Sequence, residues 1–260
     1  MRRSKKALLG LVPPLVLLLA WEIASRSSPE SRHTFIPLTL ILQSVGEVLA
    51  KRESWVNIGA SLWTASSGFL VGSLLGAGLG AAMALSGIVE RTVSPLFNAW
   101  RPIPTLGMVP LIALWFGNGE LSKLIIVSLA AFEPMVLNTH EGLRNVDRSY
   151  LEVGKLLKFD RRRVFTKILW PAAMPSVLTG VFHALGFAWI STVGAELLFT
   201  IGPGIGGMLE KGQLAGRMEI VITCILLIGL MSFTMNHFFV LLNRRVLRWR
   251  SIRQHEFGSG

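Results

Sequence analysis

Apolar and polar residues alternate along the chain in long blocks. A hydrocarbon core of about 30 Å requires about 20 apolar residues in a helix that spans it. Runs of nearly that length or longer cover residues 7–24, 59–85, 93–116, 121–138, 171–199 and 218–242. The pattern therefore predicts an all-α membrane protein with six transmembrane helices. Apolar residues at helical spacing over residues 38–49 predict a further short helix that lies on the membrane surface.

Positive charge is concentrated on the predicted cytoplasmic side. The two termini and the inner loops hold eighteen of the twenty-six Lys and Arg residues. Because Lys and Arg accumulate in cytoplasmic loops, this distribution predicts that both termini are cytoplasmic. We expect a cytoplasmic N-terminus over residues 1–6 and a six-helix domain over residues 7–247. A cytoplasmic tail then covers residues 248–260, and residues 255–260, particularly the last three, read as an added sequence outside the fold.

The composition is that of a membrane protein. Hydrophobic residues make up 51% of the 260 residues, and the mean hydropathy is positive, which is too apolar for an ordinary soluble domain. A formal net charge of +11 would suit a nucleic-acid partner, but the basic residues flank apolar spans, as the positive-inside rule predicts. We therefore predict contact with membrane lipid and no nucleic-acid partner.

Four glycines recur every four residues in the second predicted span, at Gly68, Gly72, Gly76 and Gly80. Residues four apart lie on one face of a helix, and small residues there let two helices approach closely. We expect this face to pack against another helix and not against lipid. The partner helix lies either in the same chain or in a second subunit.

The third predicted span contains Pro95, Pro102, Pro104 and Pro110. Proline removes a backbone donor, and the carbonyl left without a partner is tolerated in a membrane only beside protein or a watery cavity. We therefore expect this segment to line a translocation pathway. Arg101 precedes the cluster, and it either extends to the inner interface or attracts an anion along that pathway.

Two carboxylates lie in later predicted spans. Ionisable side chains are rare inside membranes and are candidates for function by default, so Glu133 and Glu196 are pathway candidates. Alternatively, Glu133 is protonated or bonded to a neighbouring helix, and Glu196 only caps the outer end of its own helix. His183 is interpreted as a buried histidine, since no second metal ligand follows it at helical spacing, and no metal site is predicted.

A polar stretch over residues 147–175 separates the fourth and fifth predicted spans. It contains seven basic and three acidic residues, yet its apolar residues still fall at helical spacing. This pattern predicts two short amphipathic helices. Between two membrane spans, such a segment offers a docking surface for a soluble partner on the cytoplasmic side.

This stretch resembles the cytoplasmic loop motif of ATP-binding-cassette (ABC) importer permeases, because Glu152, Ile168 and Pro171 stand where the motif has the same residues. Four positions depart from the motif: Val153 and Gly154 replace two alanines, Lys158 replaces a glycine, and Trp170 replaces a leucine. Glycine makes left-handed turns without steric cost. We expect either that Lys158 makes the family's glycine turn with some strain or that the turn is shifted.

A longer match extends the resemblance to the subfamily of these permeases for sulfonates, taurine, nitrate and related small anions. It includes Arg101-Pro102-Ile103-Pro104, Leu114-Trp115-Phe116-Gly117, Ala188-Trp189 and Ala195-Glu196-Leu197. The resemblance implies the type I importer permease architecture, which is also called MetI-like. It implies a pathway that contains Arg101, Pro102, Pro104, Pro110, Glu133, Trp189 and Glu196.

The resemblance also implies a cytoplasmic ATPase-coupling loop over residues 141–170 and just beyond it. The implied coupling residues are Tyr150, Glu152, Gly154, Lys158, Arg161, Arg162, Arg163, Ile168 and Pro171. For the three arginines, the alternative is positive-inside charge without a specific contact.

The implied protein is a non-catalytic subunit in the inner (plasma) membrane of a prokaryote. It would work with a second permease copy or paralogue, two ABC ATPase subunits, and a periplasmic or lipid-anchored solute-binding protein. No cofactor is implied on this chain itself, because ATP and Mg would bind to the ATPase subunits.

The implied solute is a small anion, most readily an aliphatic sulfonate or taurine. Nitrate or another oxyanion comes second, and an aromatic or vitamin-precursor solute third. An ion-coupled secondary transporter is the alternative from another class, but the inverted repeat typical of such proteins is not visible in the sequence. A membrane-embedded enzyme is not supported, since no spacing typical of a metal site or a nucleophile occurs.

Overall fold

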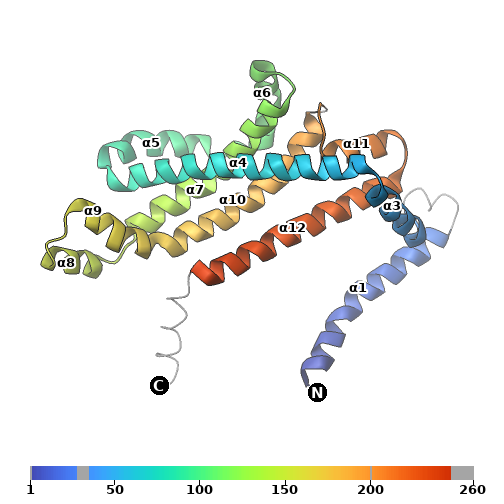
Figure 1. The fold of residues 1–260 in the computed structure, drawn as a ribbon, viewed down its shortest axis with the longest axis horizontal. Coiled ribbons are helices and arrows are strands. Elements are labelled where there is room, and N and C mark those ends of the chain that lie inside the picture. Colours follow the sequence, from blue (N-terminus) through green and yellow to red (C-terminus); the bar gives the residue numbers. More distant parts are fainter. Residues whose placement is uncertain (1, 28–34, 200, 247–260) are drawn as a thin grey trace.

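The computed structural model describes residues 2–27, 35–199 and 201–246, and all regular structure within these ranges is helical (Figure 1). The predicted tail over residues 248–260 lies outside the described residues. The helices are α1 (Arg2–Ser27), α3 (Leu38–Ala50), α4 (Arg52–Leu85), α5 (Gly87–Trp100), the 3-10 helix η1 (Thr105–Met108), α6 (Val109–Phe116), α7 (Glu120–Arg144), α8 (Arg148–Leu156), α9 (Arg161–Val164), the π-helix η2 (Phe165–Leu169), α10 (Trp170–Leu198), α11 (Ile205–Leu214) and α12 (Met218–Val246).

Within the described residues, three helices are long and apolar enough to cross a membrane. They are α4, the continuous helix Arg161–Leu198 formed by α9, η2 and α10, and Met218–Leu241 of α12. These helices match the second, fifth and sixth predicted spans. Helices α1 and α7 cover the positions of the first and fourth predicted spans, and α3 covers the predicted surface helix. The all-α prediction is confirmed.

The prediction of one continuous third helix over residues 93–116 is wrong. Helix α5 ends at Trp100, residues 101–104 form a turn, and η1 and α6 complete the segment. Pro102 and Pro104 account for the break, because each lacks a backbone N–H and disfavours helical dihedrals in the residue before it. In Figure 1, α6 projects away from the common direction of α4 and α5.

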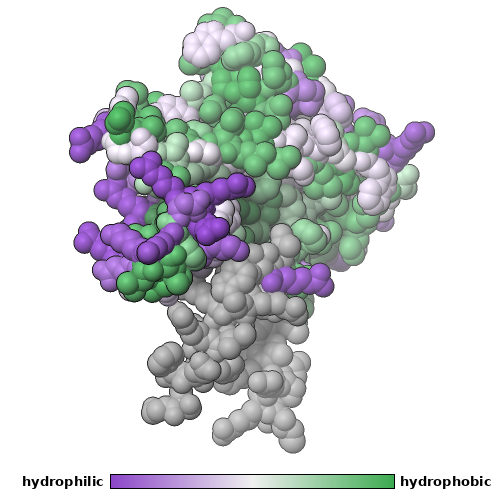
Figure 2. All heavy atoms as spheres, turned by 60° about the vertical axis from the view of Figure 1, so that its left-hand side comes forward, coloured by the Kyte–Doolittle hydropathy of each residue, from purple (hydrophilic) through white to green (hydrophobic). Residues whose placement is uncertain are grey.

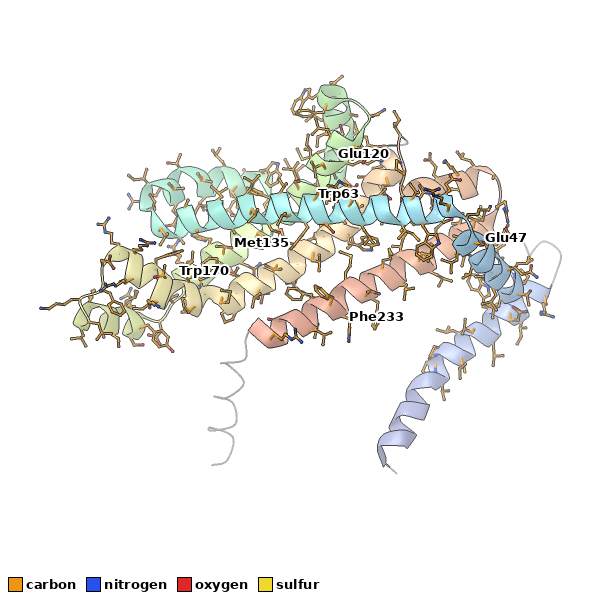
Figure 3. The ribbon with its side chains drawn as sticks, in the orientation of Figure 1. Glu47, Trp63, Glu120, Met135, Trp170 and Phe233 are labelled. Carbon is orange, nitrogen blue, oxygen red and sulfur yellow. The ribbon has the colours of Figure 1, made fainter. Side chains whose placement is uncertain are left out.

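The centre of the fold is the close packing of α4 on α7. A Cβ atom on Gly68 would lie 2.5 Å from Val127 Cγ1, and one on Gly76 would lie 2.5 Å from the carbonyl oxygen of Phe132. Glycine is therefore required for this approach, as the four-residue spacing predicted, and the partner helix lies in the same chain. Figure 3 marks Met135, one of the α7 residues in the buried core shared with α10.

The outer faces of the helices carry large exposed apolar side chains. Trp63 on α4 is 74% exposed and Phe233 on α12 is 67% exposed, and both are labelled in Figure 3. Soluble monomers rarely expose so much contiguous apolar surface, whereas helices that contact lipid do so regularly. These faces fit a chain surrounded by lipid or by other membrane subunits.

Candidate functional site

Helix α8 begins at an acidic cap in the polar loop. The Asp147 carboxylate accepts a hydrogen bond from the backbone N–H of Ser149 at 2.9 Å. Asp147 is exposed, and the hydrogen bond from the Ser149 backbone lowers the pKa of its carboxyl group. Asp147 thus satisfies one of the free N–H groups at the start of the helix.

Helix α8 ends in a left-handed turn at Lys158. The Lys158 N–H donates to the carbonyl of Lys155 and the Phe159 N–H donates to the carbonyl of Gly154, both at 3.0 Å. This is the Schellman pattern of helix termination, which requires one residue with positive φ. Lys158 has φ 51°, and it is the one non-glycine residue with positive φ in the described ranges. Of the two alternatives expected from the sequence, the structure therefore has the first: Lys158 makes the turn, and the turn is not shifted.

The predicted second short helix is not a separate element. Residue Asp160 caps α9 by accepting the N–H of Arg163 at 3.0 Å, and the helix then continues through η2 into α10. The π-turn, in which the Trp170 N–H donates to the carbonyl of Phe165, lies directly before Pro171. Because Pro171 has no N–H and its ring crowds the preceding turn, the wider π-turn accommodates it.

Helix α8 packs on this continuous helix through Gly154. A Cβ atom on Gly154 would lie 2.6 Å from Ile168 Cδ1, so two of the predicted coupling residues are in close contact. Next to this contact is a groove of about 870 Å³ between α8, the C-terminal end of α7 and the N-terminal end of α10, and Tyr150, Lys167 and Pro171 are among its lining residues.

Large apolar side chains are exposed at the end of α8 although their surroundings are polar. Leu156 is 82% exposed and Leu157, which directly follows α8, is 58% exposed. Val153, which lines the groove, is 51% exposed, and Glu152 is also exposed. The predicted coupling residues Arg161, Arg162 and Arg163 are all exposed on the neighbouring helix. Figure 2 shows hydrophilic side chains gathered at this end of the molecule, with hydrophobic ones among them. An apolar patch with a polar rim is typical of a protein-docking surface.

Two of the predicted pathway residues form an ion pair. The Nε atom of Arg101, at the end of α5, lies 3.4 Å from Oε1 of Glu133 on α7, and both side chains are partly exposed. Pro102 and Pro104 lie exposed in the turn that follows Arg101, and Pro110 is exposed at the start of α6. The Arg101–Glu133 pair agrees with one alternative given above, that Glu133 is bonded to a neighbouring helix.

Glu196 lies in a buried network near the C-terminal end of α10. Its side chain is 2% exposed, and it accepts hydrogen bonds from the Ser61 hydroxyl at 2.7 and 2.9 Å and from the Gly206 N–H at 2.9 Å. Ser61 accepts the N–H of Ile205, and Asn57 accepts the N–H of Gly204. These side chains satisfy the free N–H groups at the start of α11. A pathway role for Glu196 stays a prediction.

Sequence reasoning missed a buried cation next to this network. Lys123 is 1% exposed, and its Nζ donates to Glu120 at 2.9 Å and to the carbonyl of Ile201 at 2.7 Å. Lys123 could have been recognised from the sequence, because a charged residue inside a predicted membrane span is a candidate for function. Asn57 and Ser61 carried no such signal, because uncharged polar residues are common near helix ends.

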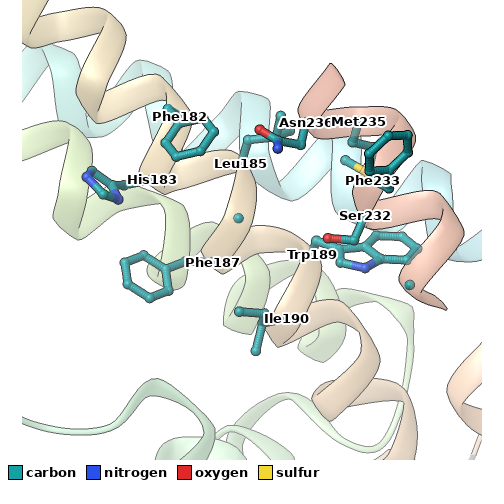
Figure 4. Close-up of a pocket in the computed structure, with 12 residues that line it drawn as sticks. Phe182, His183, Leu185, Phe187, Trp189, Ile190, Ser232, Phe233, Met235 and Asn236 are labelled. Carbon is teal, nitrogen blue, oxygen red and sulfur yellow. The ribbon is translucent and has the colours of Figure 1, made fainter. Parts of the chain in front are cut away.

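A second groove, of about 520 Å³, lies between α10 and α12 (Figure 4). Trp189 lines it, is 3% exposed, and has a buried Nε1 atom without a hydrogen-bond partner among the described residues. His183 also lines the groove. The interpretation of His183 as a buried residue is wrong, because its side chain is exposed on the open face of α10.

Comparison with known proteins links this arrangement to one family. The family model for the binding-protein-dependent transport system inner membrane component matches residues 68–248. SsuC of Bacillus subtilis (strain 168), assigned as an aliphatic sulfonates transport permease protein, is 31% identical over 243 residues, which are 93% of this chain and 87% of SsuC. The taurine transport system permease protein TauC of Escherichia coli (strain K12) is 30% identical, covering 75% of this chain and 70% of TauC.

Two further similarities concern another solute and the fold. The nitrate import permease protein NrtB of Leptolyngbya laminosa is 31% identical over 69% of this chain and 64% of NrtB. A chain from the MetNI methionine ABC transporter, in inward-facing conformations, superposes with a TM-score of 0.52 at 16% identity. That superposition covers 80% of this chain and 97% of the solved one. At this identity the superposition shows the MetI-like fold alone.

Proposed function

Because the chain belongs to the family of binding-protein-dependent transport system inner membrane components, we propose that it is the permease subunit of an ATP-driven importer for a small organic anion. Its partners are a second permease copy or paralogue, two ABC ATPase subunits and an external solute-binding protein. ATP and Mg bind to the ATPase subunits, and this chain is not catalytic. The complex resides in the inner membrane of a prokaryote.

The exposed apolar face of α8 is the observation that carries this proposal. Exposed Leu156 ends α8 and exposed Leu157 follows it, and α8 stands at one end of the molecule (Figure 1). Basic side chains are exposed on the neighbouring helix. A soluble partner that covered these leucines would bury apolar surface, and acidic groups on that partner would meet Arg161 to Arg163. A cytoplasmic ATPase subunit is a partner of this kind, and Glu152 lies on the same helix.

The contact of Gly154 with Ile168 gives the docked subunit a mechanical route into the membrane. Ile168 belongs to the continuous helix Arg161–Leu198, which reaches from the cytoplasmic loop to the buried network around Glu196. When the ATPase subunits close on ATP, they push α8 against this helix. Because a helix moves as a rigid element, the push shifts α10 and switches the pathway between outward and inward access.

The proposed topology has six membrane spans and cytoplasmic termini. It rests on the distribution of Lys and Arg and on helices at all six predicted positions, of which the third is broken after Trp100. The break does not prevent the segment from crossing, since non-helical backbone is tolerated at membrane depth where it lines a cavity or is covered by protein. The Arg101–Glu133 pair lies at this break.

The names of relatives support the proposed solute class. SsuC and TauC are named for aliphatic sulfonates and taurine, and they support a sulfonate as the first choice. NrtB is named for nitrate, which keeps an inorganic oxyanion as the alternative.

The test is copurification of the partner ATPase with tagged permease after co-expression in native membranes. Leu156→Asp places a charge in the apolar face of α8 and is expected to reduce the recovered ATPase at least tenfold. Glu152→Ala, made as a separate variant, is expected to reduce ATP hydrolysis by the complex that copurifies with it.

Leu214→Asp is the matched control. Leu214 is 81% exposed, like Leu156, but it ends α11 at the opposite end of the molecule (Figure 1). The control should recover as much ATPase as the wild type. Equal recovery with Leu156→Asp would show that α8 is not the docking surface.

A further inference from the structure

Two ion pairs join α5 to α7 at two levels. In the first turn of α5, Glu90 pairs with Arg144 in the last turn of α7. Arg101, eleven positions after Glu90, pairs with Glu133, eleven positions before Arg144. Because eleven residues make about three helical turns and rise about 16 Å, the two charged residues of each helix lie on one face. The two helices are therefore antiparallel, and charged side chains join them at both levels.

The Glu90–Arg144 pair lies where each helix favours such a charge. A carboxylate is favoured in the first turn of a helix and a basic group in the last turn, because of the helix dipole. Helix α5 begins at the end of the molecule where α8 and α9 lie (Figure 1). The side chain of Glu90 is 29% exposed. Its pair with Arg144 is therefore partly shielded from water, unlike a fully solvated surface pair, which contributes little.

His140 is a third member of this cluster. Its Nε2 atom lies 3.6 Å from Oε1 of Glu90, and it is buried without a hydrogen-bond partner in the described part of the chain. An unprotonated Nε2 cannot donate to a carboxylate, whereas the charged imidazole ring carries an N–H on both nitrogens. Histidine is the side chain that ordinarily changes its charge between about pH 5 and pH 8. A proton on His140 would thus give Glu90 a second cationic partner on the same helix.

The elements packed around His140 bring few other charges. Helix α4 approaches the backbone of His140 at Gly80 and has no charged residue after Glu53, and the first three turns of α10 have none. The charged residues on the surrounding elements are Glu90 and Arg91 of α5, Glu141 and Arg144 of α7, and Lys167 of η2. Arg91, Glu141 and Lys167 are exposed. Among the described residues, Glu90 is the carboxylate that pairs with His140.

The cluster lies between the coupling loop and the predicted pathway. Three residues separate Arg144 from the start of α8, and α5 leads directly into the turn at Pro102 and Pro104. We propose that Glu90 is a positioning residue that links the coupling loop to α5 through Arg144, and that His140 tightens this link when the cytoplasm is acidic. The inference rests on the proposed function and adds its regulation. Because a switch of access requires helices to move relative to one another, a tighter link slows transport.

The first test is ATP-driven uptake of a labelled alkanesulfonate into proteoliposomes that contain the whole complex. The ATPase side of the membrane is held at about pH 6 or at about pH 8, on either side of the ordinary range of histidine. Wild type and His140→Gln are compared at each pH, so that the pH dependence of the ATPase cancels in their ratio. At the acidic pH the wild type is expected to be about threefold slower than His140→Gln, as an ion pair of ordinary strength would give, and at the alkaline pH equally fast. His183→Gln, at an exposed histidine of α10, is the matched control and should follow the wild type.

Glu90→Gln tests the positioning role. It keeps the size of the side chain and removes the charge that holds Arg144 and His140. We expect it to lower the amount of solute transported per ATP about threefold and to abolish the pH response, while α8 still recovers the ATPase. Glu90→Asp, which keeps the charge, should retain the pH response. A lower recovery of the complex with an unchanged ratio of solute to ATP would contradict the positioning role.

The second test measures the link without the ATPase. Spin labels are attached to Ile88→Cys and Asn145→Cys, two exposed and uncharged positions at the joined ends of α5 and α7, in the full chain with Cys224→Ser in lipid nanodiscs. Labelled chain is diluted with unlabelled chain, so that the measured distances lie within one copy. The distance distribution should be narrower at the acidic pH, and His140→Gln should make it independent of pH.

Equal distance distributions at the two pH values would overturn the proposal, and so would an equal narrowing in His140→Gln. A pH response of uptake that His140→Gln retains in full would also overturn it. If the narrowing is absent while the ATPase still copurifies through α8, this inference falls and the importer assignment stands. Narrowing in a chain that supports no ATP-driven uptake would instead contradict the importer assignment.

Discussion

Glycine has opposite effects at two helix pairs in this molecule. Between α4 and α7, Gly68, Gly72, Gly76 and Gly80 bring two backbones into contact, and any side chain there would overlap the partner helix. Between α10 and α12, Gly186 and Gly229 face empty space. The first pair forms the rigid centre of the fold. The second leaves a groove of about 520 Å³ between the two helices.

The spacing of the glycines along the chain distinguishes these two uses. Four glycines at regular intervals on one helix form a continuous seam, and such a seam is useful only for close packing. A single glycine on each of two facing helices lets the helices approach more closely only where the two glycines contact each other. Gly186 and Gly229 make no such contact. Helix α10 belongs to both regions, since it packs on α7 with one face and borders the groove with another.

Gly76→Leu should produce the largest loss of stability. The new side chain would overlap the carbonyl oxygen of Phe132, which belongs to the backbone and cannot move aside. Overpacking of this kind costs about 3 kcal/mol at the upper end of its usual range. The free energy of unfolding in detergent, measured by titration with a denaturing detergent, is expected to fall by about that amount.

Gly78→Leu is the control for the seam, because Gly78 lies on the same helix and faces open space. It should be at least as stable as the wild type. If both variants were equally stable, α4 and α7 would not be packed as described.

Glu196→Ala should have the next largest effect, and it tests whether the C-terminal end of α10 is fixed independently of α12. Removal of the carboxylate leaves the Gly206 N–H and the Ser61 hydroxyl without their partner. A buried group left unpaired costs roughly 2 kcal/mol. The same unfolding titration measures the loss, and Glu152→Ala, at an exposed site, should show none.

Lys158→Gly concerns a turn whose left-handed backbone favours glycine but is made by lysine. The left-handed conformation at φ 51° is strained for lysine, so glycine should stabilise the end of α8 by up to about 1 kcal/mol. Slower amide hydrogen exchange in α8 is the expected signature. Lys155→Gly, inside the same helix, should have the opposite sign and about the same size. Faster exchange in both variants would contradict the assigned turn.

Gly186→Leu should have the smallest effect on stability and a positive sign. Leucine is a better helix former than glycine, and the side chain enters open space, so a gain of about 0.5 kcal/mol is expected. A loss similar to that of Gly76→Leu in the unfolding titration would mean that α10 and α12 are packed closely at this point.

Much of the fold follows from local patterns in the sequence. The glycine spacing predicted the seam of α4, and the loop motif gave a left-handed turn at Lys158 as one of two alternatives, because each feature depends on one helix or one turn. The third span was predicted as one continuous helix because the assignment followed its run of apolar residues and not its prolines. Two prolines within three residues, Pro102 and Pro104, end a helix whatever the hydropathy.

The site was less predictable, because it depends on contacts between distant segments. Trp189 and the loop residues were chosen by resemblance, while the groove opposite Trp189 consists of α12 residues that carry no signal of their own. The burial of Glu196 depends on Asn57 and Ser61, more than 130 positions away. No periodicity in one helix reveals which residues face it in another.

ATP-driven uptake of a labelled alkanesulfonate into proteoliposomes most directly tests the central claim, that α8 couples an ATPase to solute passage through this chain. The vesicles contain this chain, its ATPase and the loaded binding protein. We predict uptake that requires ATP, that is lost in Leu156→Asp and that persists in Leu214→Asp. Uptake that continued without ATP, or that was equal in the two variants, would contradict the account.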